Sequence, residues 1–324
     1  MIALLTNNSY LKLGIYLKTP MAEMEQLNFE VSDGKLINSY RWTPETEIKA
    51  IIHIAHGMGE HAARYNWTAQ QFCQAGYAVV ANDHRGHGKT AAEPGDFGEN
   101  GWNRMVDDLY EMIQSYSDQY PGKEKILFGH SMGSLLSQQY VTRYGNSVDR
   151  LILSGSPGFS PLIMVLISRI IGRFEHWRLG PLKESELLRF LIFSSANKEF
   201  ESEVAEQSGF EWLSRDQTEV NKYVDDPLCG FVPYPASLAG MFDGVRDAQR
   251  KANIRRIPGD LPVYLFSGSA DPVHKNKHNI NRLLDAWRER GLTIEVKYYD
   301  GGRHEMLNEV NKAQVITDLL RWLN

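Results

Sequence analysis

A serine between two glycines, in the pentapeptide GHSMG centred on Ser131, is the first stretch of this sequence whose residue types point to chemistry. It follows a short apolar run at residues 125–128 and precedes a helical pattern that ends near Gly145. Paired glycines permit a sharp turn from a strand into a helix, and that turn lifts the serine hydroxyl to where a base and a substrate can reach it. Because the pattern also occurs in ordinary packed turns, its meaning depends on the partners that the rest of the chain supplies.

Two later loops supply such partners. A serine hydroxyl is a poor nucleophile at its free pKa, so Ser131 needs a base. His304 and Asp271 each follow a predicted strand, and the loops at the carboxyl ends of parallel strands meet at one edge of a sheet. His304 can take the serine proton while Asp271 holds the imidazole tautomer, so that an acyl-enzyme can form. Asp243 and Asp300 are rival acids, but neither ends a predicted strand with a suitable loop after it.

The negatively charged intermediate of such a reaction also needs hydrogen-bond donors that are already in place. The backbone N–H of Met132 comes directly after Ser131, and that of Met58 lies in a glycine-rich loop at residues 56–61. We therefore expect the Met58 and Met132 amides to form an oxyanion hole. Loss of one such donor raises the barrier by roughly 3 kcal/mol.

These loops must be held by a sheet, and the strand pattern predicts its form. Nearly continuous apolar runs, typical of strands buried on both faces, alternate with helical patterns after an initial hairpin. This alternation of strand and helix patterns stops between residues 157 and 258, where only helical and loop patterns occur. We therefore expect an α/β fold with a mostly parallel central sheet, helices on both faces and an inserted helical cap. The predicted strands are 27–31, 36–42, 50–55, 77–81, 125–128, 150–154, 262–266 and 293–298.

The domain organisation follows from the same interruption. We expect an N-terminal extension at residues 1–26, a first part of the α/β core at 27–156, a helical cap at 157–258 and a second part of the core at 259–324. No internal repeat or low-complexity tract divides the chain further.

Six motifs give the chain a resemblance to a known family. They are HGMGEH at 56–61 followed by Arg64 and Tyr65, DHRGHG at 83–88, GHSMG at 129–133, DPL at 226–228, SADPV at 269–273 and GGRHE at 301–305. With them, residues 27–324 resemble an α/β hydrolase of the monoacylglycerol lipase and bacterial lysophospholipase type, related to the serine aminopeptidase S33 group. The resemblance implies the α/β-hydrolase fold, a catalytic triad of Ser131, Asp271 and His304, and oxyanion donors at Met58 and Met132.

Composition disfavours nucleic-acid-binding, disulfide-rich secreted and membrane-spanning proteins. The 324 residues carry 35 basic and 40 acidic side chains, a formal charge of −5, which gives no basic footprint for nucleic acid. Two cysteines cannot build a disulfide framework and suit a reducing compartment. The N-terminus lacks the features of a signal peptide, and no apolar stretch is long enough to span a membrane. We expect a cytoplasmic protein that can contact membrane surfaces peripherally through the cap, and the sequence does not determine its oligomeric state.

No metal or organic cofactor is implied. The tripeptide at 88–90 resembles the end of a phosphate-binding loop but lacks the glycine required five positions earlier. Asp83 and Arg85 are expected to form a structural ion pair. Five histidines invite a zinc site, but they lack metal-ligand spacing and a helping cysteine, so loop-organising hydrogen bonds explain them better. They are His53, His56, His61, His84 and His87.

The cap is expected to select the substrate. Its segments 161–171 and 187–193 are richly aliphatic, which suits either an acyl-chain pocket or the packing of the cap itself. We expect a carboxylic ester hydrolase for monoacylglycerols, lysophospholipids or similar single-chain lipid esters, with Phe159, Phe193 and Phe242 lining the pocket. Two alternatives stay open. One is an aminopeptidase or amidase with the same triad, whose cap would need acidic residues for a free amine, and the other is a non-catalytic binding protein.

Overall fold

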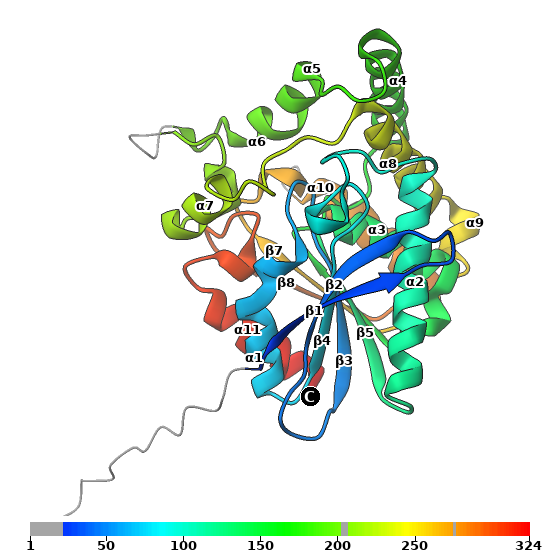
Figure 1. Ribbon diagram of the computed structural model, residues 1–324, viewed down its shortest axis with the longest axis vertical. Coiled ribbons are helices and arrows are strands. Elements are labelled where there is room, and N and C mark those ends of the chain that lie inside the picture. Colours follow the sequence, from blue (N-terminus) through cyan, green and yellow to red (C-terminus); the bar gives the residue numbers. More distant parts are fainter. Residues whose placement is uncertain (1–21, 202–206, 275–276) are drawn as a thin grey trace, which may run out of the picture.

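A twisted sheet forms the centre of the molecule (Figure 1). The computed structural model describes residues 22–201, 207–274 and 277–324. Within them, eight strands are arranged in the order β1-β2-β4-β3-β5-β6-β7-β8. β1 and β2 are antiparallel to their neighbours, whereas β3 to β8 run parallel. The strands are β1 Met24–Glu30, β2 Leu36–Trp42, β3 Ala50–Ala55, β4 Ala78–Asn82, β5 Glu124–His130, β6 Arg150–Ser154, β7 Val263–Gly268 and β8 Ile294–Tyr299.

Helices connect the parallel strands and surround the sheet. In the described residues they are α1 Asn66–Gln74, α2 Gly101–Gln119, α3 Met132–Tyr144, α4 Leu162–Leu179, α5 Glu186–Arg189, α6 Ser195–Asn197, α7 Gln217–Val224, α8 Pro235–Ala248, α9 Lys251–Ile254, α10 His278–Arg290 and α11 Lys312–Leu323. A π-helical turn covers Phe190–Ser194, and short 3-10 turns cover Ala62–Tyr65, Gly88–Thr90, Gly145–Ser147, Glu211–Leu213, Pro272–His274 and Met306–Asn308.

Burial on both faces explains why the central strands are continuous apolar runs. Every residue of β3 is buried, and successive residues of β5 and β6 point to opposite faces of the sheet. Leu127 and Leu151 pack with α2, α3 and α10 on one face. Ile126 and Ile152 pack with α1 and α11 on the other. The parallel strands are thereby fixed with their carboxyl ends at one edge, where the loops singled out by the sequence lie.

The predicted α/β class is confirmed, including the mostly parallel sheet with helices on both faces. The predicted hairpin is present as β1 and β2, which pair in antiparallel register from Met24 opposite Trp42 to Glu30 opposite Leu36. β1 begins three residues earlier than expected, so residues 24–26 pair with β2 instead of belonging to an extension. The rest of the predicted extension, except residues 22–23, lies outside the described residues.

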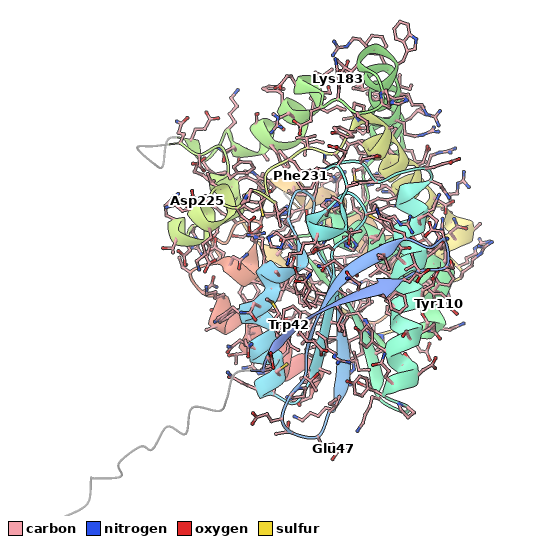
Figure 2. The ribbon with its side chains drawn as sticks, viewed as in Figure 1. Trp42, Glu47, Tyr110, Lys183, Asp225 and Phe231 are labelled. Carbon is pink, nitrogen blue, oxygen red and sulfur yellow. The ribbon has the colours of Figure 1, made fainter. Side chains whose placement is uncertain are left out.

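The chain between β6 and β7 is called the β6–β7 segment below. Its described residues form helices α4 to α9 and contain no strand; in Figure 1, α4 and α5 lie at the top and α6 and α7 on the left. α4 packs against α8, which also contacts α2 and α3. Figure 2 shows the side chains of Lys183, Asp225 and Phe231, which come from this segment. Across the described ranges, no helix combines the length and apolar character needed to cross a membrane.

Candidate active site

Ser131 sits in a strained turn between β5 and α3. It has a backbone φ of 51° and occupies the position just before the first residue of α3. The flanking glycines allow close approach of the backbone: a Cβ on Gly133 would lie 2.0 Å from the carbonyl oxygen of Ala55, and one on Gly129 would lie 2.4 Å from that of Gly133. No larger side chain fits at either position without displacement of the backbone. The sharp turn expected from the pentapeptide is therefore present.

Ser131, His304 and Asp271 form a continuous hydrogen-bonded series. Oγ of Ser131 lies 2.9 Å from Nε2 of His304. Nδ1 of His304 lies 3.1 and 3.0 Å from the two carboxylate oxygens of Asp271. Asp271 also accepts hydrogen bonds from the Ser267 hydroxyl at 2.8 Å and from the backbone N–H of Val273 at 3.0 Å. The structure thus brings together all three side chains that the sequence singled out.

The rival carboxylates lie elsewhere. Asp243 on α8 pairs with Arg169 and Arg173 on α4. Asp300 is exposed and accepts a long hydrogen bond from the Ser269 hydroxyl. Neither is a partner of the His304 imidazole, so Asp271 is the acid of this series.

Burial and pairing set the charge state of Asp271 and His304, each of which is 2% exposed. Burial raises the pKa of Asp271, but the charge and hydrogen bond of His304 outweigh it and lower the pKa to about 2. Burial lowers the pKa of His304, but Asp271 outweighs it and the pKa lies above its usual value of 6.5. Asp271 is therefore ionised at neutral pH and favours a proton on Nδ1, which leaves Nε2 as the acceptor for the serine proton.

The two methionine amides proposed as oxyanion donors lie beside the serine. Met58 and Met132 both line the cavity in front of Ser131. Within the described ranges, neither backbone N–H donates to a protein acceptor. The loop with Met58 passes close to the nucleophile, since a Cβ on Gly57 would lie 3.3 Å from Cβ of Ser131. An oxyanion hole needs donors that are not already paired within the protein, and the sequence prediction assigns that role to these two amides.

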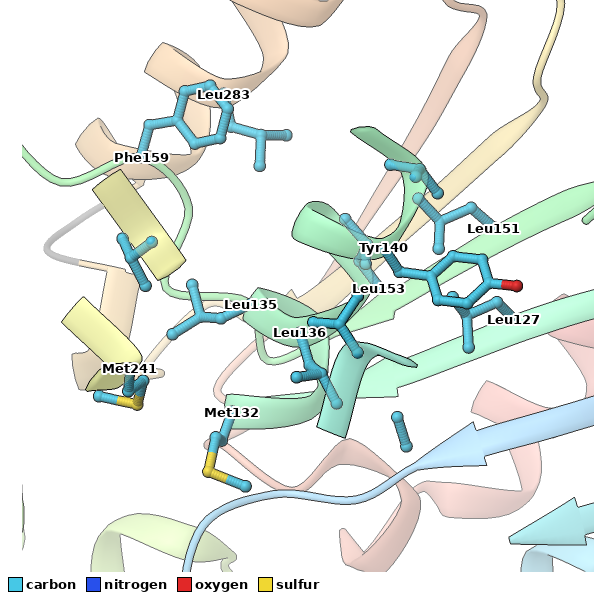
Figure 3. Close-up of a cluster of buried hydrophobic side chains, with 14 of the residues drawn as sticks. Leu127, Met132, Leu135, Leu136, Tyr140, Leu151, Leu153, Phe159, Met241 and Leu283 are labelled. Carbon is cyan, nitrogen blue, oxygen red and sulfur yellow. The ribbon is translucent and has the colours of Figure 1, made fainter. Parts of the chain in front are cut away.

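A cavity of about 290 Å³ opens beside Ser131. Its walls are largely apolar and are contributed mainly by the β6–β7 segment, with Phe193 and Phe242 among them, as expected. Phe159 does not line it, contrary to the prediction. Its backbone N–H donates to Asn279 at 2.8 Å, and its ring packs against Trp287 near Leu283, in the core under α10 (Figure 3). Apolar lining residues from this segment include Val165, Ile192, Phe193, Met241, Phe242 and Val245.

Trp212 is part of the site and was missed by the sequence analysis. Its ring lies over the His304 imidazole, with ring centroids 4.8 Å apart, and its carbonyl oxygen accepts the backbone N–H of His304 at 3.3 Å. Trp212 therefore holds both the ring and the backbone of the histidine. It lies in a short 3-10 turn without a repeating apolar pattern, so the local sequence offered no signal for this role.

Residues 46–311 match the family described as serine aminopeptidase, S33. The chain belongs to this family. Over 292 residues it is 27% identical to the monoacylglycerol lipase of Mycolicibacterium smegmatis, a match that covers 87% of this chain and 90% of that protein. It is 26% identical over 306 residues to the monoglyceride lipase of Homo sapiens, with coverage of 90% and 88%.

Solved structures of an esterase and a lipase have a similar fold. A thermostable carboxyl esterase from Bacillus coagulans in complex with glycerol superposes with a TM-score of 0.83 at 25% identity, covering 94% of this chain and 99% of that one. A lipase in an open form gives a TM-score of 0.82 at 26% identity, covering 93% and 98%. The predicted α/β-hydrolase fold and the predicted kinship with monoacylglycerol lipases are confirmed, and the comparisons support the predicted class of carboxylic ester hydrolase.

In this S33 family member, the histidines near the site organise loops. Nε2 of His56 accepts the backbone N–H of His84 at 3.0 Å, and Nδ1 of His56 lies 2.8 Å from the carbonyl oxygen of Gly57. Burial lowers the pKa of both His56 and His87 to about 3, so these rings are neutral. The His56 bond fixes the loops after β3 and β4 against each other, as the sequence analysis expected. His53 does not fit that expectation, because it lies within β3 and its buried Nε2 has no hydrogen-bond partner.

The expected ion pair between Asp83 and Arg85 is wrong. Arg85 forms a bidentate pair with Asp108 on α2, at 2.7 and 2.9 Å, and also contacts Asp33. Asp83 instead accepts the backbone N–H groups of residues 62 and 89, each at 2.8 Å. The prediction paired Asp83 with Arg85 because they are close in the sequence. The turn after β4 directs their side chains to different partners.

His61, Asp226 and Cys229 are the described side chains whose grouping could hold a metal ion, with ligand atoms within 4.8 Å of one another. Nε2 of His61 already lies 2.8 Å from Oδ2 of Asp226. Burial raises the pKa of the Cys229 thiol, and the positive charge of Arg64 acts on both Asp226 and Cys229. A protonated thiol and a nearby guanidinium both disfavour a cation. The group is better explained as a hydrogen-bonded tie between the loop at 56–61 and the β6–β7 segment.

Proposed function

We propose that this chain hydrolyses carboxylic esters of single-chain lipids, such as monoacylglycerols or lysophospholipids, through an acyl-enzyme on Ser131. The observation that carries the proposal is the series Ser131–His304–Asp271 at the wall of an apolar cavity. The kinship with monoacylglycerol lipases supports the same substrate class.

The reaction follows from the positions of the protons. Nε2 of His304 takes the proton of the Ser131 hydroxyl as Oγ attacks the ester carbonyl carbon. The carbonyl oxygen becomes an oxyanion, for which the amides of Met58 and Met132 are the proposed donors. His304 then gives its proton to the departing alcohol, leaving an acyl-enzyme. A water molecule, deprotonated by His304, then attacks the acyl carbonyl carbon. The bond to Oγ breaks, His304 returns the proton to Oγ of Ser131, and the fatty acid leaves, while Asp271 stabilises the imidazolium in both halves.

The cavity walls support an acyl chain as the recognised group. The β6–β7 segment supplies Val165, Phe193, Met241 and Phe242, among others. We propose that residues 157–258 of this segment act as a cap over the serine. Each buried methylene contributes about 0.8 kcal/mol, so a medium-length chain would dominate binding.

A free amine is the alternative ligand, and the hydrogen bonds that the carboxylates at the cavity already accept disfavour it. The carboxylates that line the cavity are Glu60 and Glu305. Both are paired with the guanidinium of Arg64, at 2.5 and 2.7 Å. An amino group would have to displace an arginine from a buried network to be bound there. Ester hydrolysis is therefore favoured over aminopeptidase or amidase activity.

The exposed face of α4 supports weak contact with lipid surfaces. Met164 lines the cavity and is also 53% exposed, so the apolar face of α4 borders the opening. Ile163, Ile170 and Trp177 extend that face into solvent. A substrate that resides in a membrane would reach the serine from such a contact.

A substrate panel tests the proposal. The purified chain is assayed on p-nitrophenyl esters from acetate to palmitate, 1-monoacylglycerol, lysophosphatidylcholine and an aminoacyl anilide. Lipid esters are expected to be hydrolysed with a maximum at one chain length. Turnover of the anilide alone would replace the ester function with an amidase function. Failure of Ser131 to react with a fluorophosphonate probe, together with no turnover, would instead favour a non-catalytic binding role.

A further inference from the structure

Arg64 joins two loops that are distant in sequence. Its Nη1 and Nη2 atoms donate to Oε1 and Oε2 of Glu305 at 2.8 and 2.7 Å, and Nη1 also donates to Oε2 of Glu60 at 2.5 Å. Glu60 belongs to the loop at residues 56–61, called the oxyanion loop below, and Glu305 follows His304 directly. The Arg64 guanidinium therefore connects the loop that contains the Met58 amide to the loop that contains His304.

On one side of the bridge, Glu60 holds the backbone of the oxyanion loop. Its Oε1 accepts the backbone N–H of Gly57 at 2.6 Å and the Tyr65 hydroxyl at 3.0 Å. Gly57 is the residue before Met58, and a Cβ added to it would lie 3.3 Å from Cβ of Ser131. The direction of the Glu60 carboxylate thus sets the turn that presents the Met58 amide.

On the other side, Glu305 is tied to the backbone of the histidine loop. Its Oε2 also accepts from Nδ2 of Asn308 at 2.8 Å, and its backbone N–H donates to Leu213 at 2.8 Å. Because Glu305 directly follows His304 in the chain, the contacts that hold Glu305 also restrain the backbone that carries the imidazole. The Arg64 guanidinium itself lies over the Tyr223 ring, 4.8 Å from its centroid, which limits its own movement.

The network is buried and ionised. Burial raises the pKa of Glu60 and of Glu305, but Arg64 outweighs it and the pKa of each lies below its usual value. Two carboxylates and one guanidinium therefore leave a net negative charge near His304. Buried ion pairs add little net stability compared with apolar side chains of similar size. The geometry that this network imposes is a better explanation for its presence at the site.

We propose that Arg64 is a positioning residue that fixes the oxyanion loop relative to His304, so that donor and base act on the same substrate carbonyl. This inference rests on the proposed ester hydrolysis. Arg64 does not line the cavity itself, so its action on the reaction passes through Glu60 and Glu305.

The test compares Arg64→Lys with Arg85→Lys. A lysine ammonium keeps the charge but cannot make the bidentate pair while reaching a second carboxylate. Arg85 makes an equivalent bidentate pair with Asp108 outside the cavity lining, so Arg85→Lys controls for the loss of a buried pair. With p-nitrophenyl butyrate, Arg64→Lys is expected to lower kcat by about 100-fold with KM within about threefold, because misplacement by 1 Å has this effect on rate. Arg85→Lys is expected to keep the wild-type kcat.

A pH profile gives a readout that partial loss of fold would not change, because the position of its acid limb depends on the charges around His304. His304 is faced by Asp271, Glu305, Glu60 and His130. Arg64→Met removes the positive charge between the two glutamates, so their negative charge acts on the imidazole uncompensated and the acid limb of kcat/KM should move to higher pH. Arg85→Met should leave that limb in place.

If Arg64→Lys does not fold, Glu305→Gln serves as the second variant, and a fall in kcat without a rise in KM is again expected. Unchanged kcat in the folded Arg64 and Glu305 variants overturns the inference, and so does a rise in KM alone. These results leave ester hydrolysis by the wild-type chain intact. A wild-type chain that hydrolyses no ester and whose Ser131 does not react with fluorophosphonate overturns the proposed function and this inference with it.

Discussion

Oγ of Ser131 lies 2.9 Å from Nε2 of His304, although 173 positions separate the two residues in the chain. The sheet order produces this contact, because β5, β6, β7 and β8 are consecutive neighbours and their carboxyl ends share one edge. Trp212 from the β6–β7 segment then covers the imidazole. The chemistry of the site therefore depends on the parallel sheet and on one inserted segment.

The pH dependence of activity should report the ionisation of His304. The reaction needs a neutral imidazole, and Asp271 holds the pKa of His304 above 6.5 despite burial. The value of kcat/KM should therefore fall as the pH drops through a pKa above 6.5. Asp271→Asn should lower that pKa and reduce kcat by about 10⁴-fold. The measurement is a pH–rate profile with p-nitrophenyl butyrate.

The exposed rival acid provides the control for that experiment. Asp300→Asn should keep the wild-type profile, because Asp300 makes no contact with the imidazole. An Asp271→Asn variant with nearly wild-type kcat would remove Asp271 from the mechanism.

The depth of the cavity should set the preferred acyl length. Met241 lines the cavity from α8, and Met241→Trp would fill part of it. Long esters should lose kcat/KM by about fourfold for each methylene that no longer fits, while acetate and butyrate esters are retained. Phe159→Leu is the control, since Phe159 packs in the core and should affect the unfolding temperature without changing the chain-length profile. An unchanged profile for Met241→Trp would place the acyl chain elsewhere.

Buried neutral histidines should make the fold sensitive to acid. Burial lowers the pKa of His53, His56 and His87 to about 3, whereas an unfolded chain protonates them near pH 6.5. Below pH 6.5 the unfolded state binds more protons, so the free energy of unfolding falls as the pH falls, by about 1 kcal/mol per pH unit for each histidine. Urea denaturation at pH 7 and pH 5 measures this slope.

His53→Phe isolates one histidine in that measurement. It should reduce the slope by the contribution of one proton, because His53 is buried beside Tyr116 and outside the site. A free energy of unfolding that does not change between pH 7 and pH 5 would show that these rings are not held neutral.

Contact with lipid should depend on α4. In a sedimentation assay, a fraction of the protein should pellet with phosphatidylcholine vesicles at both low and moderate salt, because the contact is apolar. Trp177→Ser, which removes a side chain that is 79% exposed, should lower that fraction. Val310→Ser removes an apolar side chain that is 60% exposed elsewhere and should not. No sedimentation of the wild-type chain with vesicles would count against the contact.

The α/β core was predictable because local patterns carry its physics. Strands buried on both faces are apolar runs, and the glycines at 129 and 133 mark a turn where any Cβ would collide with backbone. The order of Ser131, Asp271 and His304 along these strands then placed the three side chains at one edge of the sheet.

The parts that were missed depend on contacts between distant segments. Phe159 was expected to line the pocket with Phe193 and Phe242, but its backbone N–H bonds to the carbonyl oxygen of Asn279 and its ring packs against Trp287 in the core. Arg85 finds its partners on α2 and on the β1–β2 hairpin, and no local pattern links those positions. Trp212 carries no periodic signal at all. Such assignments require the three-dimensional structure.

The most direct test of the central claim is hydrolysis of a monoacylglycerol by the wild-type chain and by Ser131→Ala, with circular dichroism to verify that both are folded. The account predicts turnover by the wild type, labelling of Ser131 by a fluorophosphonate, and a loss of kcat by about 10⁴-fold or more in Ser131→Ala. A folded Ser131→Ala variant that hydrolyses the ester at a similar rate to the wild type would contradict it.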